Sequence, residues 1–232
     1  MTASTLWWSQ FFLNLSAGIF GSLLVILLVD RALEKERERD KREKFALNRL
    51  RPLIYRHLQT LCSIFKAVTS KKPDLFPASI GDIFAENFPK LMLSLDLTKK
   101  ETPTSQDWFI YLSSETKDLT RNLEKIIEAY QDSLNIELLG ILESFSNSPL
   151  LGLLSILPAI RQKNLTLNLE NQKAIANPFT LTMGFHLLVK NHILLLLNLI
   201  ENMNSRIQNK ICLEEISVFR NDYTPKWGTS RL

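Results

Sequence analysis

Few side chains in this sequence are suited to acid–base or metal chemistry, and they are scattered. The 232 residues include three histidines, His57, His186 and His192, and two cysteines, Cys62 and Cys212. His186 and His192 would lie on different faces of a helix, and the cysteines form no CxxC pair with the spacing of a zinc site. No phosphate-binding loop or hydrolase motif occurs. The sequence therefore predicts neither a metal nor a cofactor.

One short segment has the residue types needed for phosphodiester cleavage. Arg51 precedes His57 by six positions in the run RPLIYRH. These seven residues resemble the Arg-x(4–6)-His motif of the HEPN ribonuclease superfamily, whose domains are all-helical and whose active site forms between two protomers. The resemblance implies that Arg51 would stabilise phosphate charge and that His57 would act as the acid/base. The two are the only candidate catalytic residues.

The same histidine also has a simpler interpretation. His57 lies on an apolar helical stripe with Leu50, Ile54 and Leu61, and His192 lies on the apolar face of a later helix. Histidines in such positions are usually core residues whose ring nitrogens are satisfied by neighbours. On this interpretation neither histidine takes part in chemistry.

The strongest signal in the chain concerns a membrane. Residues 6–29 contain no ionisable side chain and would form a helix about 36 Å long, enough to cross a hydrocarbon core of about 30 Å. Trp7 and Trp8 stand at the start of this segment, where indole rings favour the interface, and a basic run begins at Arg31. The excess of basic residues after the segment predicts a single span in the cytoplasmic (inner) membrane, with the N-terminus outside and the rest in the cytosol.

One face of the predicted span carries small and polar residues, which we call the small-residue face: Gln10, Asn14, Gly18, Gly21 and Ser22. Small residues at this spacing allow close approach of helices, and an amide in lipid favours a hydrogen-bonding partner. The face predicts self-association. A pore lined by rings of Gln10 and Asn14 is a more specific form of the same hypothesis.

The remainder predicts an all-α protein. Residues 31–50 interleave acids and bases and predict a solvated helical stalk, followed by a cytosolic helical bundle over 51–220 and a flexible tail over 221–232. The expected domains are thus 1–30 (tail and span), 31–50, 51–220 and 221–232. Pro52 predicts a kink or a new helix start, and Thr104 with Asp107 predicts a capping-box-like helix start.

This layout resembles small prokaryotic membrane proteins that have one N-terminal span and a cytosolic helical domain and that occur beside antiviral, including CRISPR-associated, systems. The resemblance implies oligomers that disturb the membrane. The leading hypothesis is a non-enzymatic membrane effector or pore-like assembly controlled by its cytosolic domain. An anchor or scaffold for a cytosolic protein is second, and a membrane-tethered HEPN-like ribonuclease third. The expected partners are the bilayer and a second copy, because a net charge of +4 is too small to predict nucleic acid.

Overall fold

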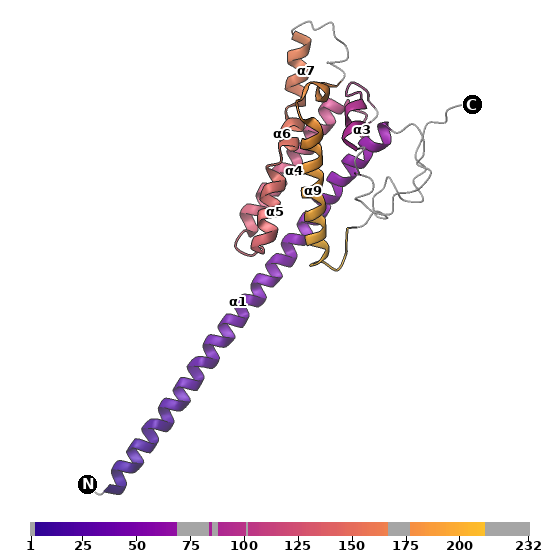
Figure 1. Cartoon of the computed structure of the whole chain (residues 1–232). Helices are drawn as coiled ribbons and strands as arrows, with labels where there is room; N and C mark the ends of the chain where they lie inside the picture. Colours follow the sequence, from indigo (N-terminus) through magenta and orange to yellow (C-terminus); the bar gives the residue numbers. More distant parts are fainter. Residues whose placement is uncertain (1–2, 69–83, 85–87, 101, 167–176, 212–232) are drawn as a thin grey trace.

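The fold is all-helical, as the sequence predicted. The structure, a computed structural model, describes residues 3–68, 84, 88–100, 102–166 and 177–211, and no strand occurs in these ranges. One very long helix extends from a compact helical domain built around its C-terminal half (Figure 1). The predicted tail at 221–232 lies outside the described residues.

Helix α1 runs without interruption from Ala3 to Val68. At 1.5 Å per residue its 66 residues span about 100 Å. Because α1 extends from Ala3 to Val68, the predicted boundaries at 30/31 and 50/51 fall inside one helix. Pro52 also lies inside it, and both Pro52 and Asn48 are exposed. Water can therefore hydrate the Asn48 carbonyl, which has lost its usual N–H donor at position 52.

The two halves of α1 differ in what surrounds them. All described side chains from Phe11 to Arg42 are exposed, although those up to Val29 are largely apolar. Burial begins at Ala46 and recurs with helical spacing through Ile64. The core-facing part of α1 therefore starts about one turn before the predicted boundary at residue 51.

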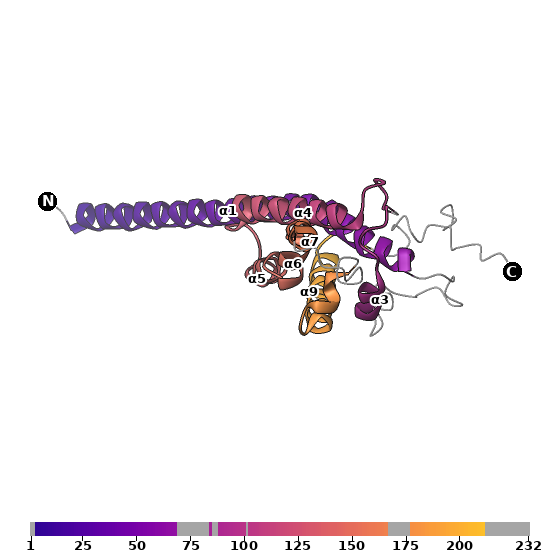
Figure 2. The ribbon, with the colours of Figure 1, turned by 90° about the horizontal axis from the view of Figure 1, so that it is seen from above.

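The domain surrounds the buried half of α1 with seven shorter elements. They are α3 (Phe88–Ser94), α4 (Trp108–Tyr130), α5 (Ile136–Ser146), α6 (Pro149–Ser155), α7 (Leu157–Thr166), the 3-10 helix η1 (Pro178–Leu181) and α9 (Phe185–Asn204). Figure 2 shows α1 and α4 side by side, with α5, α6, α9 and α3 displaced to one side of them. Gly184 separates η1 from α9.

Contacts at both ends establish that α4 is antiparallel to α1. Arg56 of α1 binds Glu115 near the start of α4, whereas the Phe45 ring meets the Tyr130 ring at the end of α4. The N-cap of α4 is Asp107, whose carboxylate accepts a hydrogen bond from the Ile110 backbone N–H. The predicted capping box would have placed the N-cap at Thr104, whereas the N-cap is Asp107 and α4 begins three residues later than that box implies.

Two stretches are long and apolar enough to cross a membrane, Phe11–Phe65 and Ile136–Lys163. None of the most apolar part of the first is buried in the protein, whereas a third of the second is. The second stretch is also divided into α5, α6 and α7, with caps at Asn147 and Ile156. Its longest continuous helix has 11 residues, about 17 Å, which is shorter than a bilayer core.

A single buried amide joins α3 to the segment before α9. The Asn177 Nδ2 group donates to the carbonyl oxygens of Met92, Leu93 and Leu95 at distances of 2.6–3.0 Å. Its Oδ1 accepts from the Phe179 backbone N–H at 2.9 Å. Since the last carbonyls of a helix lack intrahelical partners, Asn177 satisfies the end of α3 and holds it beside α9.

Candidate functional site

The N-terminal part of α1 presents a fully exposed apolar surface that begins with a cluster of four aromatic rings. The rings of Trp7, Trp8, Phe11 and Phe12 lie 5.0–6.0 Å apart in successive stacked and edge-on pairs. More than half of each indole surface is exposed. An exposed apolar cluster of this kind is typical of a surface that contacts another protein or a membrane, and the bilayer interface favours indole rings.

The small-residue face lies within this exposed part of α1. A shallow groove of about 430 Å³ runs along the helix beside Asn14, Gly18 and Ser22. A Cβ atom added at Gly18 or Gly21 would meet nothing within 4 Å. Nothing in the chain itself therefore requires glycine at either position, and the absence of side chains leaves room for another helix. The Gln10 side chain lies outside the described residues.

The two polar side chains of this groove differ in how they are satisfied. Ser22 donates its hydroxyl to the Gly18 carbonyl of the same helix, at 2.9 Å. The Asn14 amide is exposed and has no hydrogen-bond partner among the residues that the structure describes. In lipid, an amide in that state favours a partner on a neighbouring helix. Arg31, also exposed, follows at the start of the charged stalk.

The two candidate catalytic residues do not converge within the chain. Arg51 and His57 are separated by about 9 Å along α1 and by about 120° around it. The Arg51 Nε group donates to the backbone carbonyl of Asn209 at 2.9 Å and so fastens the chain after α9 to α1. His57 instead faces the core.

His57 belongs to a buried polar cluster that joins three helical elements. Its Nε2 atom lies 2.8 Å from Nε2 of His192 on α9, and Nδ1 of His192 lies 2.9 Å from the hydroxyl of Ser148, the N-cap residue of α6. The His192 ring stacks on Phe145 at 5.0 Å, and the His57 ring meets Phe145 edge-on. Both histidines are buried, as their positions on apolar stripes predicted.

Burial keeps this histidine pair neutral. It lowers the pKa of His57 to about 4, and burial together with the nearby His57 lowers the pKa of His192 well below its usual value. One Nε2 must donate and the other accept, so a single proton lies between the rings. A base this weak is poorly suited to proton transfer at neutral pH. The hydrogen bond instead fixes the position of α1 relative to α9.

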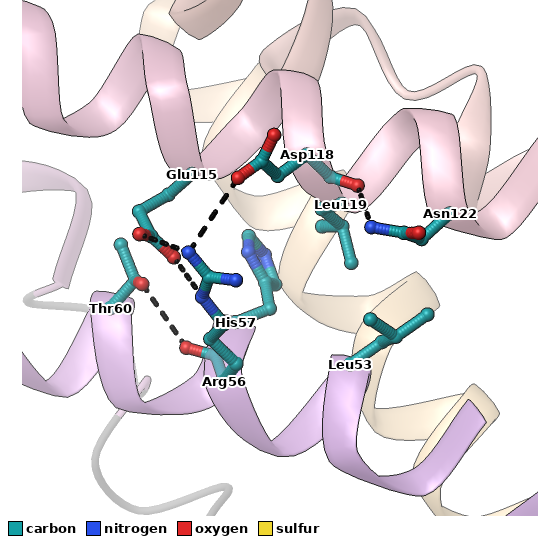
Figure 3. Close-up of a pocket in the computed structure, with 8 residues that line it drawn as sticks. All are labelled: Leu53, Arg56, His57, Thr60, Glu115, Asp118, Leu119 and Asn122. Atoms are coloured by element: carbon teal, nitrogen blue, oxygen red, sulfur yellow. Dashed lines mark hydrogen bonds and ion pairs between the residues drawn. The ribbon is translucent and has the colours of Figure 1, made fainter. Parts of the chain in front are cut away.

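Arg56, rather than Arg51, lines the same cavity as the buried His57, and the Arg56 side chain is exposed. Figure 3 shows the Arg56 guanidinium reaching the Glu115 carboxylate, with bonds of 2.6 and 2.7 Å, close to Asp118 at 3.7 Å. This ion pair lies over a cavity of about 10 Å³ that His57 also lines, room for one water molecule at most. The hydrogen bond to Glu115 is the main cause that raises the pKa of Arg56.

Sequence reasoning found the histidines but not their partners. Ser148 and Glu115 lie 91 and 58 residues beyond His57, in helices whose packing no local pattern specifies. An Arg directly before a core-facing His on an amphipathic helix was the only local signal for Arg56. No group of three or more His, Cys, Asp or Glu residues in the described ranges could hold a metal ion.

Comparisons with known proteins found no match: no family model fits the sequence, and neither a curated protein nor a solved structure is significantly similar to it.

Proposed function

We propose that the protein is a single-pass membrane protein that self-associates through the small-residue face and acts as a membrane effector under the control of its helical domain. The observation that carries the proposal is the continuity of α1. One helix contains the exposed apolar segment and, with no break, the buried positions from Ala46 to Ile64. Any rotation or displacement of the domain is therefore transmitted directly to the apolar segment.

The choice of a single span follows from comparing the two apolar stretches. The apolar segment of α1 contacts nothing in the chain, whereas Ile136–Lys163 is broken twice and contributes Leu142, Phe145 and Leu154 to the core. Placing the second stretch in lipid would expose its breaks at Asn147 and Ile156, and backbone groups without intrahelical partners are costly in a hydrocarbon core. The excess of basic residues in the stalk supports an orientation with the domain on the cytosolic side.

Self-association is supported by the groove beside Asn14, by the unpartnered Asn14 amide and by the open space above Gly18 and Gly21. Hydrogen bonds between membrane helices contribute about 1–2 kcal/mol, which is about 5- to 30-fold in a dissociation constant. Assembly into a leaky structure would make the protein an effector. A role in antiviral defence stays a prediction from layout.

The test uses a matched pair of serines. Ser16 and Ser22 are both exposed, both donate to a carbonyl of their own helix and lie about 120° apart around it. We expect Ser22→Leu, Gly21→Leu and Asn14→Leu to weaken association at least tenfold and to reduce leakage of dye-filled vesicles. Ser16→Leu should do neither. Native mass spectrometry of the full chain in nanodiscs measures the oligomer.

The proposal fails in two distinguishable ways. If all four variants form the same oligomers as the unsubstituted chain, the small-residue face takes no part in the assembly. A monomer in every lipid composition, in the unsubstituted chain, would favour the second candidate, an anchor that recruits a cytosolic protein. That candidate is favoured by Met183 and Leu181, whose apolar side chains are exposed on the domain surface.

A further inference from the structure

The groove between α3 and α9 combines an apolar floor with unpaired cations. Its volume is about 510 Å³, within the range of small-molecule sites. Phe84 and Ile193 form part of the floor and are almost fully buried, whereas Leu194 at the rim is 55% exposed. Lys90 and Lys190 also line it. Among the residues that the structure describes, the lining includes no acidic residue.

The polar and apolar parts of the groove are separated along α9. His186 and Lys190 lie one turn apart in the first half of the helix, and Ile193, Leu194 and Leu197 follow in the next two turns. From Lys190 to Leu197 the helix rises about 10 Å. The helix dipole of α9 adds positive potential at its N-terminus, which is the cationic end of the groove.

Neither lysine is neutralised within the protein. Lys90 and Lys190 form no ion pair or hydrogen bond among the residues that the structure describes, and both are exposed. Elsewhere the exposed cation Arg56 does find carboxylates, in Glu115 and Asp118. Two free ammonium groups beside an uncovered aliphatic surface are complementary to one kind of molecule, an anion with an aliphatic body.

We propose that this groove binds a free medium-chain carboxylate, with the carboxylate near Lys90, His186 and Lys190 and the aliphatic chain along Ile193, Leu194 and Leu197. A free molecule is favoured over bilayer lipid because of where the groove lies. Figure 1 shows α3 beside the C-terminal end of α1, at the opposite end from the apolar segment. Asn177 holds α3 in place and so preforms one wall.

The groove is also connected to α1. His192 lies one residue before Ile193 and forms the buried hydrogen bond to His57. A ligand that orders α9 therefore acts on the helix that contains the apolar segment. The binding itself does not depend on the proposed membrane function, and the experiment below measures binding alone.

The experiment uses photo-crosslinking of the full chain in nanodiscs of a zwitterionic lipid. The probe is a decanoic acid with a diazirine at the end of its chain, and mass spectrometry locates the labelled peptides. We expect labels on α3 and α9, and competition by decanoate. Decanol, which lacks the charge, and acetate, which lacks the chain, should each compete at least tenfold less well.

Charge reversal tests the cations. Lys190→Glu and Lys90→Glu should each lower the labelling yield about tenfold, whereas Lys163→Glu, the same change at an exposed position on α7, should leave it unchanged. Leu194→Asn should weaken labelling without reversing charge. Because the lysines are exposed and stabilise no partner, we expect each variant to keep its helices. Circular dichroism verifies this.

Three results would overturn the proposal. Labels confined to other elements would place the site elsewhere. Equal competition by decanol and decanoate, or full labelling of Lys190→Glu, would remove the anionic component. Competition by phosphatidylglycerol vesicles well beyond that of zwitterionic vesicles would identify the groove as a membrane contact. None of these results depends on oligomeric state, so failure here leaves the proposed function standing.

Discussion

At the scale of single residues, the most consequential feature is the proton shared by His57 and His192. The two Nε2 atoms lie 2.8 Å apart, so one ring must be the tautomer that donates and the other the tautomer that accepts. The Ser148 hydroxyl contacts Nδ1 on the other side of the His192 ring. The cluster fixes α1 against α9 and against the start of α6 at one height along their axes. Buried polar bonds specify such a register because every alternative leaves a donor or acceptor unpaired.

Acid should destabilise the domain through this pair. The pKa of His57 falls from 6.5 to about 4 on folding, so between these values the unfolded chain binds a proton that the folded chain does not. The contribution is fully present above pH 6.5 and is lost as the pH falls toward 4. Its size is on the order of 3 kcal/mol. Urea unfolding followed by circular dichroism at pH 7 and at pH 4.5 measures it.

The control for this prediction is the exposed histidine. We expect the pH dependence of His186→Gln to follow that of the unsubstituted chain, since the side chain is exposed on α9. His57→Gln should lower stability at pH 7 and flatten the dependence between pH 6.5 and 4. An unchanged slope in His57→Gln would mean that His57 does not contribute to the acid sensitivity.

At the scale of elements, α1 determines how the apolar segment and the domain face each other. A helix turns by about 100° per residue, so the angular relation between the small-residue face and the core-facing positions is fixed by the number of residues between them. Under the proposed function, the stalk therefore fixes the angle between the apolar segment and the domain. This angle depends on the length of the stalk and not on its sequence.

Insertions in the stalk test this coupling. One alanine inserted after Arg37 would turn the domain by about 100° relative to the small-residue face, whereas seven inserted residues restore the phase to within about 20°. We expect the single insertion to reduce vesicle leakage severalfold and the seven-residue insertion to restore it. Equal leakage from both would show that the apolar segment acts independently of the domain.

The elements show what the sequence could and could not predict. The all-α fold and the apolar segment followed from periodicity and composition, which are local properties, whereas the capping box predicted from Thr104 lay three residues before the N-cap of α4 at Asp107. The continuity of α1 through Pro52 did not follow from local properties, because it depends on Pro52 facing solvent, which is a consequence of packing. The break at Gly184, where φ is +70°, was likewise hidden inside an apolar run.

The candidate sites follow the same division. The small-residue face could be predicted because a helical repeat alone places Asn14, Gly18 and Gly21 together. The Arg56–Glu115 pair and the groove of Lys90 and Lys190 could not, because each joins segments that are distant in sequence. The motif reading of Arg51 and His57 stays a prediction; within one chain the two side chains serve separate contacts.

At the scale of the whole molecule, the proposed orientation has a direct test. With the N-terminus outside and the domain in the cytosol, a protease added to intact spheroplasts should leave residues after Arg31 uncut. The same protease added to inside-out vesicles should degrade the domain within minutes. An antibody to the purified domain detects the fragments, and the reverse pattern would invert the topology.

The length of the exposed part of the stalk limits what can fit between the domain and the membrane. Residues 30–42 separate the apolar segment from Glu43, the first stalk residue bound to the domain, through Arg206. These 13 residues set a gap of about 20 Å between bilayer and domain, and any tilt narrows it. A single helix, about 10–12 Å wide, fits that gap, whereas a folded domain about 30 Å across does not. In the proposed orientation, the space between the bilayer and the domain therefore admits a helix or an extended chain but not a folded domain.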